Sequence, residues 1–272
     1  ANTTANNNTA VGKNALGANT TGANNVAVGQ EALAANTTAG NNTAVGRVAL
    51  DANTTGTANV AVGTNALGTS TTASENTAVG NAALFATTTG ADNVGIGASA
   101  LDSTTTGGEN TAIGHQAGHN LTTGVNNTLL GHEAGTDAVA NVVASNGNIV
   151  IGNNYSASAK IKIDWTVTSD LRDKTEIESV PHGLNFVNQI TPIKYRFKTS
   201  RENDTPNGVT RFGFSAQEIL ALEGENPVLV DNGDTDNLKL TGAYLLPVLV
   251  NAIKELKAEN DSLKTRIENL EG

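Results

Sequence analysis

Ser169 and Lys174 lie five residues apart in the segment SDLRDK (169–174) and carry a hydroxyl and an amine. A serine hydroxyl attacks a carbonyl only when a base accepts its proton, and a lysine amine is such a base only when neutral. Bringing an amine from ~10.4 to near 7 takes ~4 kcal/mol from burial or a neighbouring cation, and Arg172 is such a cation. By itself the segment is more typical of a helix N-cap at Ser169 and Asp170 followed by a solvated lysine.

Three histidines are the other candidates for metal or proton chemistry. His115 and His132 each follow a repeated glycine, and His119 lies in an expected loop. We therefore expect surface polar residues and no metal site, although a threefold axis could gather three copies of one histidine around an ion. No P-loop, Rossmann phrase or calcium-binding nonapeptide is present, so we expect no cofactor.

The elements that must position these residues begin with a repeat. A glycine that closes the phrase N-x-A-V-G, or a close variant of it, recurs every seventeen residues through the first half of the chain. A fixed period of this length indicates stacked supersecondary units, here eight coils of a solenoid. The repeated glycines are Gly12, Gly29, Gly46, Gly63, Gly80, Gly97, Gly114 and Gly131.

Each coil is expected to hold two short strands. Residues 42–46 alternate as a strand does, and 47–50 are expected to form a second strand. Asn-Thr-Thr-Gly segments such as 19–22 and 53–56 supply the turn residues at the corners. An alanine three residues after each glycine, as at Ala49, should stack into a ladder that permits close backbone approach.

So thin a solenoid is not expected to stand alone. Ordering a residue costs ~1–2 kcal/mol, whereas burying one valine returns roughly 1.5–3 kcal/mol, and each coil has few apolar anchors. Neighbouring chains are expected to cover the apolar face. The phrase resembles the head repeats of trimeric bacterial adhesins and repeats of phage tail fibres over about residues 1–135. That resemblance implies a trimeric, left-handed parallel β-roll.

Downstream of Thr168, an ordered set of motifs resembles the intramolecular chaperone domain of endosialidase-type phage tailspikes. The set covers about residues 168–260 and implies a small α+β domain: SDLRDK at 169–174, a helix at 183–190, a strand at 191–197, a second helix after 213–218 and a terminal helix entered at 244.

The resemblance implies that Ser169 and Lys174 form a catalytic dyad that cuts the Thr168–Ser169 bond, with Asp170 and Arg172 in support. The chain would then be a single-turnover, self-cleaving serine endopeptidase. Asp173 stands where that family commonly has an apolar residue, and an adjacent carboxylate stabilises a charged amine. We infer that the site becomes competent only inside a folded trimer.

The last segment, 245–271, has the heptad pattern of a parallel coiled coil. Its a and d residues alone favour two strands, because isoleucine occupies two a positions and leucine every d position; the resemblance favours three. The expected trimerisation residues are Leu246, Leu249, Ile253, Leu256, Asn260, Leu263, Ile267 and Leu270.

Composition narrows the classes of partner. Twenty-six acidic residues against sixteen basic ones give a net charge of −10, which disfavours nucleic acid and anionic membranes. Aromatics are only 3% and cysteine is absent, so aromatic-lined pockets in the repeats, disulfides and thiolate metal sites are not expected. No apolar run approaches the roughly 18 residues of a membrane span, so membrane insertion is not expected.

Three regions follow: repeats at 1–135, a neck at 136–168 and a chaperone domain at 169–272. The predicted function is that of a homotrimeric phage tail-fibre or tailspike component, folded in the host cytoplasm and located in the virion. Its partners would be the rest of the fibre and a host-cell glycan or receptor. The alternatives are a bacterial surface adhesin and an ice- or polysaccharide-binding solenoid that uses the paired threonines at the corners. In either case the trimerisation domain would not cleave itself.

Overall fold

The computed structural model describes residues 4–136, 140–153, 155–156, 169–198, 201–233, 235–236 and 238–271. The chain divides into two compact units, residues 1–156 and 157–272. Residues 157–168 of the predicted neck, which include Thr168, lie outside the described residues. No helix in the described ranges is both long and apolar enough to cross a membrane.

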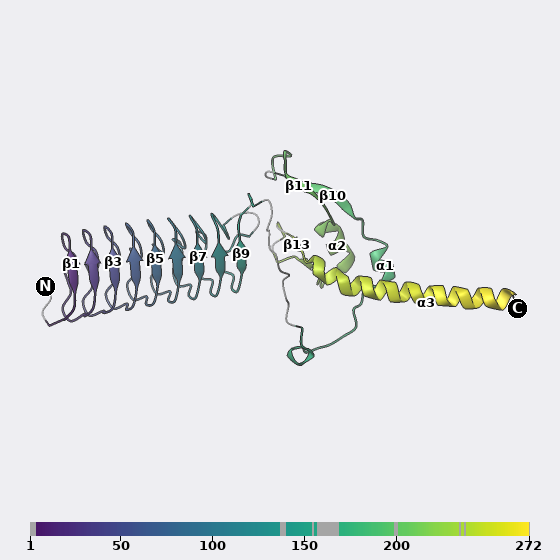
Figure 1. Cartoon of the computed structure of the whole chain (residues 1–272), viewed down its shortest axis with the longest axis horizontal. Helices are drawn as coiled ribbons and strands as arrows, with labels where there is room; N and C mark the ends of the chain where they lie inside the picture. Colours follow the sequence, from purple (N-terminus) through teal and green to yellow (C-terminus); the bar gives the residue numbers. More distant parts are fainter. Residues whose placement is uncertain are drawn as a thin grey trace. The chain divides into compact units, whose positions relative to one another are not determined.

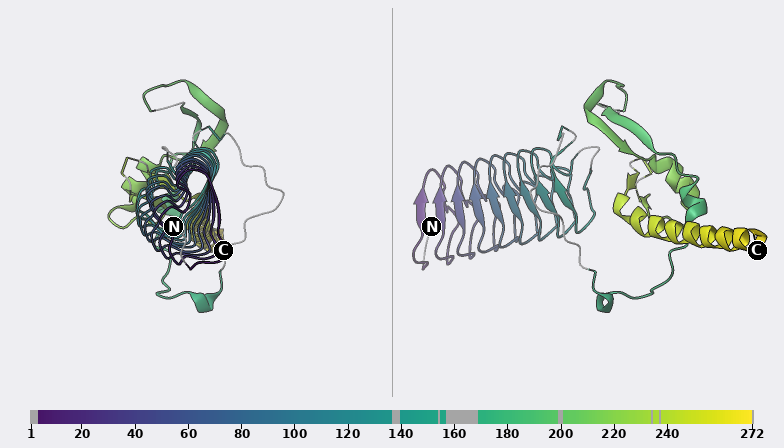
Figure 2. Two further views of the ribbon diagram at one scale, coloured as in Figure 1. Left: turned by 90° about the vertical axis from the view of Figure 1, so that its left-hand side faces the viewer. Right: turned by 45° about the vertical axis from the view of Figure 1, so that its right-hand side comes forward.

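The first unit is a β-solenoid, as the seventeen-residue period predicted (Figure 1). Each coil contributes one three-residue strand to a parallel sheet, and strand partners such as Thr43 and Val60 are seventeen residues apart. Viewed along the solenoid, successive coils superimpose (Figure 2). The strands are β1 (Thr9–Val11), β2 (Val26–Val28), β3 (Thr43–Val45), β4 (Val60–Val62), β5 (Thr77–Val79), β6 (Val94–Ile96), β7 (Thr111–Ile113), β8 (Thr128–Leu130) and β9 (Ile149–Ile151).

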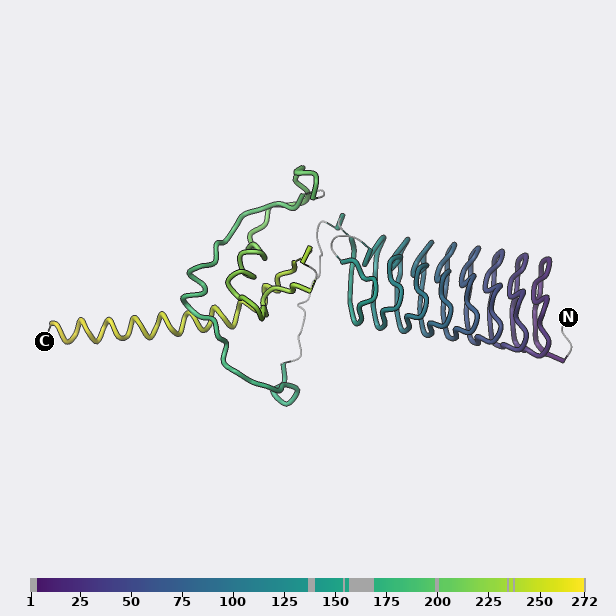
Figure 3. The backbone as a smooth tube through the Cα atoms, turned by 180° about the vertical axis from the view of Figure 1, so that it is seen from behind, coloured from purple at the N-terminus to yellow at the C-terminus, as the bar shows by residue number. Residues whose placement is uncertain are grey.

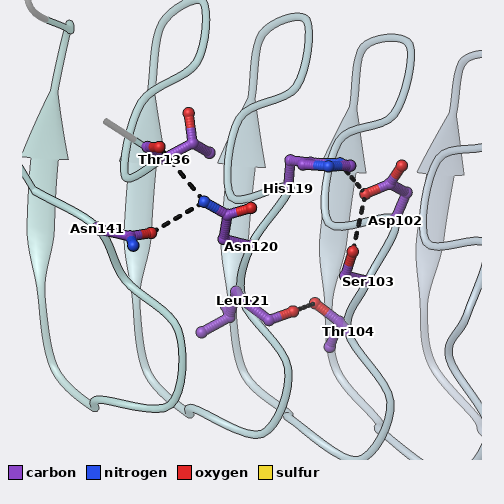
Figure 4. A network of polar contacts seen from close by, with 8 residues as sticks. All are labelled: Asp102, Ser103, Thr104, His119, Asn120, Leu121, Thr136 and Asn141. Atoms are coloured by element: carbon purple, nitrogen blue, oxygen red, sulfur yellow. Dashed lines mark hydrogen bonds and ion pairs between the residues drawn. The ribbon is translucent and has the colours of Figure 1, made fainter. Parts of the chain in front are cut away.

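The ninth strand lies beyond the last regular repeat. β9 falls in the predicted neck, yet it pairs with β8 in register, with Thr128 opposite Ile149. Four extra residues are therefore accommodated between the two strands. Asn120 holds the longer connection between β8 and β9 in place. Its Nδ2 donates to the Thr136 carbonyl at 3.3 Å and to Asn141 Oδ1 at 2.9 Å (Figure 4).

The prediction of a second strand in each coil is wrong. Residues 47–50 form a turn, in which Val48 and Leu50 have φ of 50° and 54°. These left-handed residues turn alternate peptide groups in opposite directions. The Val48 N–H donates back to Gln30 O at 2.9 Å, and the Leu50 N–H donates forward to Ala66 O at 3.0 Å. Residues 47–50 alternate in polarity as a strand would, but in the turn that they form Leu50 points into the core.

A buried column of asparagines runs beside the sheet. The Asn59 N–H donates to Asn42 Oδ1 of the preceding coil at 2.9 Å, and Asn59 Nδ2 donates to the Ala73 carbonyl at 2.8 Å. Buried polar groups need such partners. The asparagine at the start of each phrase therefore satisfies backbone groups of its own coil and of its neighbours.

Stacked alanines and leucines fill the rest of the solenoid interior. Ala49 and Leu50 are fully buried, as are their equivalents in the other central coils. In the seventh coil the leucine position becomes Gly118, where a Cβ would lie 2.7 Å from Leu101 Cδ2 and from Leu129 Cδ1. Leu129 replaces the small residue found at the centre of the earlier strands and fills that space. The loss of one leucine is thus balanced by the gain of another.

The second unit is a small α+β domain followed by a long helix (Figure 3). Its elements are η1 (Leu171–Asp173), α1 (Leu184–Val187), β10 (Ile193–Lys198), β11 (Pro206–Gly213), α2 (Ala216–Glu223), β12 (Val230–Asp231), β13 (Lys239–Leu240), η2 (Gly242–Tyr244) and α3 (Leu245–Glu271).

The core of the second unit forms where α1, α2, the β12–β13 pair and the start of α3 meet. Ile219 is fully buried there, among Phe186, Leu229, Val230, Leu245 and Val248. The helix expected over 183–190 is a single turn, whereas the strand expected at 191–197 is confirmed as β10, which pairs antiparallel with β11. α2 begins at the Ser215 cap, whose hydroxyl accepts from the Glu218 N–H at 3.3 Å.

We predict that Gly63→Ala strongly destabilises the solenoid. Gly63 has φ of 141°, and an added Cβ would lie 2.3 Å from the Gly80 carbonyl oxygen of the next coil. Left-handed strain and this clash together should cost about 3 kcal/mol or more. Thermal unfolding followed by circular dichroism in a Ser169→Ala background measures the loss. Thr38→Ala, at an exposed corner, is the control; equal midpoints for the two variants would contradict the prediction.

Candidate functional site

The segment SDLRDK folds as one short 3-10 turn. Asp170 is the N-cap of η1, because its Oδ1 accepts from the Arg172 N–H at 2.9 Å. The turn closes with the Lys174 N–H donating to the Leu171 carbonyl at 3.2 Å. The cap expected for this segment is therefore formed, by Asp170 rather than Ser169, and it brings the two ends of the segment together.

Ser169 and Lys174 are in direct contact across this turn. Lys174 Nζ lies 2.8 Å from Ser169 Oγ, which is hydrogen-bond distance. As an ammonium, Lys174 donates to the hydroxyl; as a neutral amine in the same place it could accept the hydroxyl proton. The segment therefore places a nucleophile and a base in reach of each other.

Asp170 and Arg172 form a pair of their own. Arg172 Nε lies 3.1 Å from both carboxylate oxygens of Asp170, and Nη2 lies 2.5 Å from Oδ2. The guanidinium, followed by the Arg172 backbone N–H, holds the pKa of Asp170 below its ordinary value, and the same carboxylate raises the pKa of Arg172. Arg172 is thus a cation already neutralised by Asp170, which weakens the expectation that it favours a neutral Lys174.

Both members of the Ser169–Lys174 pair are exposed in the single chain. Within the described part of the chain, no ion pair joins Asp173 to Lys174. Burial is what disfavours a charged amine, and one copy of this segment does not supply it.

α3 carries the residues expected to mediate trimerisation. It spans Leu245–Glu271, the range predicted for the coiled coil. The stripe of a and d residues is exposed: Ile253 is 65% exposed, Leu263 51% and Leu270 87%. Leu245, Val248 and Ala252, on another face of the helix, are buried in the domain core. One face of α3 thus serves its own domain, and the heptad stripe is left uncovered.

The three candidate histidines lie on the solenoid. His119 Nδ1 lies 2.5 Å from Asp102 Oδ1, and the His115 and His132 rings stack at 5.1 Å (Figure 4 shows the His119 pair). In the described residues, no group of three or more metal-ligating side chains forms.

Two residues that the sequence pattern did not single out anchor the segment downstream of the turn. Asn251 Nδ2 donates to the His182 carbonyl at 2.9 Å, and Glu255 Oε2 accepts from the Leu184 N–H at 2.6 Å. These partners are 69 and 71 residues apart in the chain. The only sequence signal for these two residues is that both are polar positions outside a and d of a heptad helix.

Comparison with known protein families finds a match within the second unit. Residues 169–229 match the family model Peptidase_S74, described as the chaperone of endosialidase. The match begins at Ser169 and includes the SDLRDK turn, α1, β10, β11 and α2, so this segment resembles a trimerisation chaperone domain. No curated protein and no solved structure matches the chain.

We predict that Arg172→Ala raises the pKa of Asp170 toward its ordinary value of 3.8. Because a lowered carboxyl pKa means that folded Asp170 prefers the charged form, the pair is complete above that value and is lost as pH falls through the lowered one. Carboxyl carbon NMR titration of aspartate-labelled chain measures the change. Lys174→Ala, the control, should leave Asp170 unmoved; an unchanged titration in Arg172→Ala would refute the assignment.

Proposed function

We propose that this chain is a component of a homotrimeric phage tail fibre or tailspike and that its C-terminal unit is a self-cleaving intramolecular chaperone. The observation that carries the proposal is the 2.8 Å contact between Lys174 Nζ and Ser169 Oγ at the first residue of the family match. Cleavage at this contact would separate the chaperone domain from the long, uniform solenoid after assembly.

Register is the problem that such a chaperone solves. The coils are so alike that sliding one chain by seventeen residues against its neighbours exchanges nearly identical side chains along most of the solenoid. An alignment device at one end is therefore needed. The exposed a and d stripe of α3, with one polar residue at Asn260, is suited to bringing three chains together in a single register.

The outer face of the solenoid supports assembly with other copies. The last residue of each strand is apolar and points away from the core; Val11 is 58% exposed, Leu130 44% and Ile151 63%. Together these residues form a continuous apolar row from coil to coil. Such a row favours burial against another molecule, and two further copies are the occupants we propose.

Cleavage would proceed by transfer of the Thr168 acyl group to the serine. A neutral Lys174 accepts the hydroxyl proton as Ser169 Oγ bonds to the Thr168 carbonyl carbon. The bond from that carbon to the Ser169 nitrogen breaks, and the nitrogen leaves as an amine that has gained a proton. Water then hydrolyses the ester, which releases the Thr168 carboxylate and restores the Ser169 hydroxyl. Because both side chains are exposed in one copy, we propose that neighbouring copies supply the burial that favours a neutral lysine.

The proposal also includes a location in the virion and binding to a host-cell glycan or receptor. The support for a glycan partner is the row of exposed threonines, one in each coil from Thr21 to Thr123, which presents hydroxyls at regular spacing. The same row supports the second candidate, a bacterial adhesin or polysaccharide-binding solenoid. That candidate has a trimerisation domain that stays attached.

The intact mass of the purified protein tests cleavage. We expect the parent to yield fragments 1–168 and 169–272, whose masses sum to that of the chain plus one water. Ser169→Ala and Lys174→Met should each remain full length, because one lacks the nucleophile and the other the base. Ser179→Ala, at an exposed serine farther along the same segment, is the control and should be cut. Full-length chain in every sample would remove the enzymatic claim and favour the second candidate.

Light scattering after size exclusion tests the trimer. In the Ser169→Ala background we expect three times the chain mass. Placing two carboxylates in the stripe, by Leu256→Asp with Leu263→Asp, should lower it to one chain, because buried unpaired charges oppose helix association. Ser262→Asp, at an exposed outer position of the same helix, should remain trimeric. A parent of one or two chain masses would contradict the threefold assembly.

A further inference from the structure

The segment that carries Ser169 and Lys174 leaves the domain as an extended arm, here defined as residues 169–182. The hydrogen bonds of residues 169–179 in the described structure are all made within the η1 turn. Leu171 and Ile177 on the arm are 66% and 65% exposed. The contacts that tie the arm to the domain are therefore concentrated where the arm joins it, in residues 180–184, which we call the root.

The root is held by α3. Asn251 Nδ2 donates to the His182 carbonyl at 2.9 Å and lies 3.5 Å from that of Val180. Four residues further along the same helix, Glu255 Oε2 accepts from the Leu184 N–H at 2.6 Å. A bond between a carboxylate and a backbone amide is charge-assisted and stronger than a neutral one. The His182 ring also stacks on Phe186 of the core at 4.1 Å.

Gly183 makes room for this contact. A Cβ at residue 183 would lie 2.1 Å from Glu255 Oε1 and 2.4 Å from Oε2. Any larger residue would push the carboxylate away from the Leu184 amide. The glycine and the glutamate therefore form one device, although they are distant in sequence.

The two root contacts lie off the heptad stripe. With Leu246, Ile253 and Asn260 at a, residue 251 falls at f and residue 255 at c. Neither is needed between the helices of a coiled coil. α3 can thus pack against its copies through one face while it holds the root with another.

We propose that Asn251 and Glu255 are positioning residues for self-cleavage, which couple the trimerisation helix to the arm that carries Ser169 and Lys174. The inference rests on the proposed function. Once the stripe brings three helices together, the root contacts fix the point from which each arm departs relative to the threefold axis. Loss of these contacts leaves the reacting groups intact but widens the range of positions that the arm samples, and small misplacements of reacting groups are costly.

The test is the rate of self-cleavage in the full-length chain, followed by intact mass after refolding from denaturant. We expect Asn251→Ala with Glu255→Ala to cut about ten- to a hundred-fold more slowly than the parent. Gly183→Ala should slow cleavage in the same direction. Glu255→Gln, whose amide oxygen can still accept from the Leu184 N–H, should recover most of the rate. Lys254→Ala, exposed beside the root contacts, is the matched control and should cut at the parental rate.

Two further measurements separate positioning from chemistry and from folding. The pH dependence of the rate should keep its shape in the double variant, because the base is unchanged. Light scattering should give a trimer for both the parent and the double variant. A trimeric double variant that cuts at the parental rate would overturn this inference alone, and a variant that no longer assembles would assign these residues to folding instead. A parent that is never cut overturns the proposed function and this inference with it.

Discussion

Hydrogen bonding between successive coils is the interaction on which the first unit depends. The coil is so narrow that much of its backbone lies inside, where an unpaired N–H or C=O costs about 1–3 kcal/mol. The motif asparagines remove this cost by accepting from one coil and donating to another: Asn59 Oδ1 accepts from the Asn76 N–H of the next coil, and the Asn59 N–H donates to Asn42 Oδ1 of the preceding coil. The glycine after each strand allows the coils to approach closely enough for these bonds to form.

That same uniformity creates the difficulty that the second unit is suited to resolve. If chains assemble as proposed, a column of near-identical coils would have many registers of similar energy between them, so correct alignment would have to come from elsewhere. α3 supplies a different kind of surface, a heptad stripe with one asparagine in it, on a helix whose other face is held by the core around Ile219. In the proposed trimer, the solenoid would supply most of the stability and α3 would supply the alignment between chains.

The candidate site depends on a local turn and on a distant helix. The η1 turn brings Ser169 and Lys174 together within six residues, with Asp170 as cap and Arg172 held by that cap. Nothing in this short turn encloses the pair. In the proposed trimer, neighbouring copies supply the enclosure, and the root contacts of α3 would link assembly to the arm.

Much of this protein follows from sequence alone, for definite reasons. The spacing of Gly12 to Gly131 determined the solenoid, because seventeen residues per coil leaves stacking as the way to bury Ala49 and its equivalents. Heptad spacing predicted the extent of α3, and the order of motifs from Ser169 onward predicted a chaperone-like domain, of which residues 169–229 match a family model.

Other features were decided only by tertiary structure. Residues 47–50 read as a strand, yet they form a turn, because hydrogen bonds to the coils on both sides require Val48 and Leu50 in left-handed conformations. The pairing of β9 with β8 across a longer connection depends on contacts such as Asn120 with Asn141, which no periodicity reveals. The hold of Asn251 and Glu255 on the root joins positions about seventy residues apart, and a pattern read along the chain carries no information on which distant groups will meet.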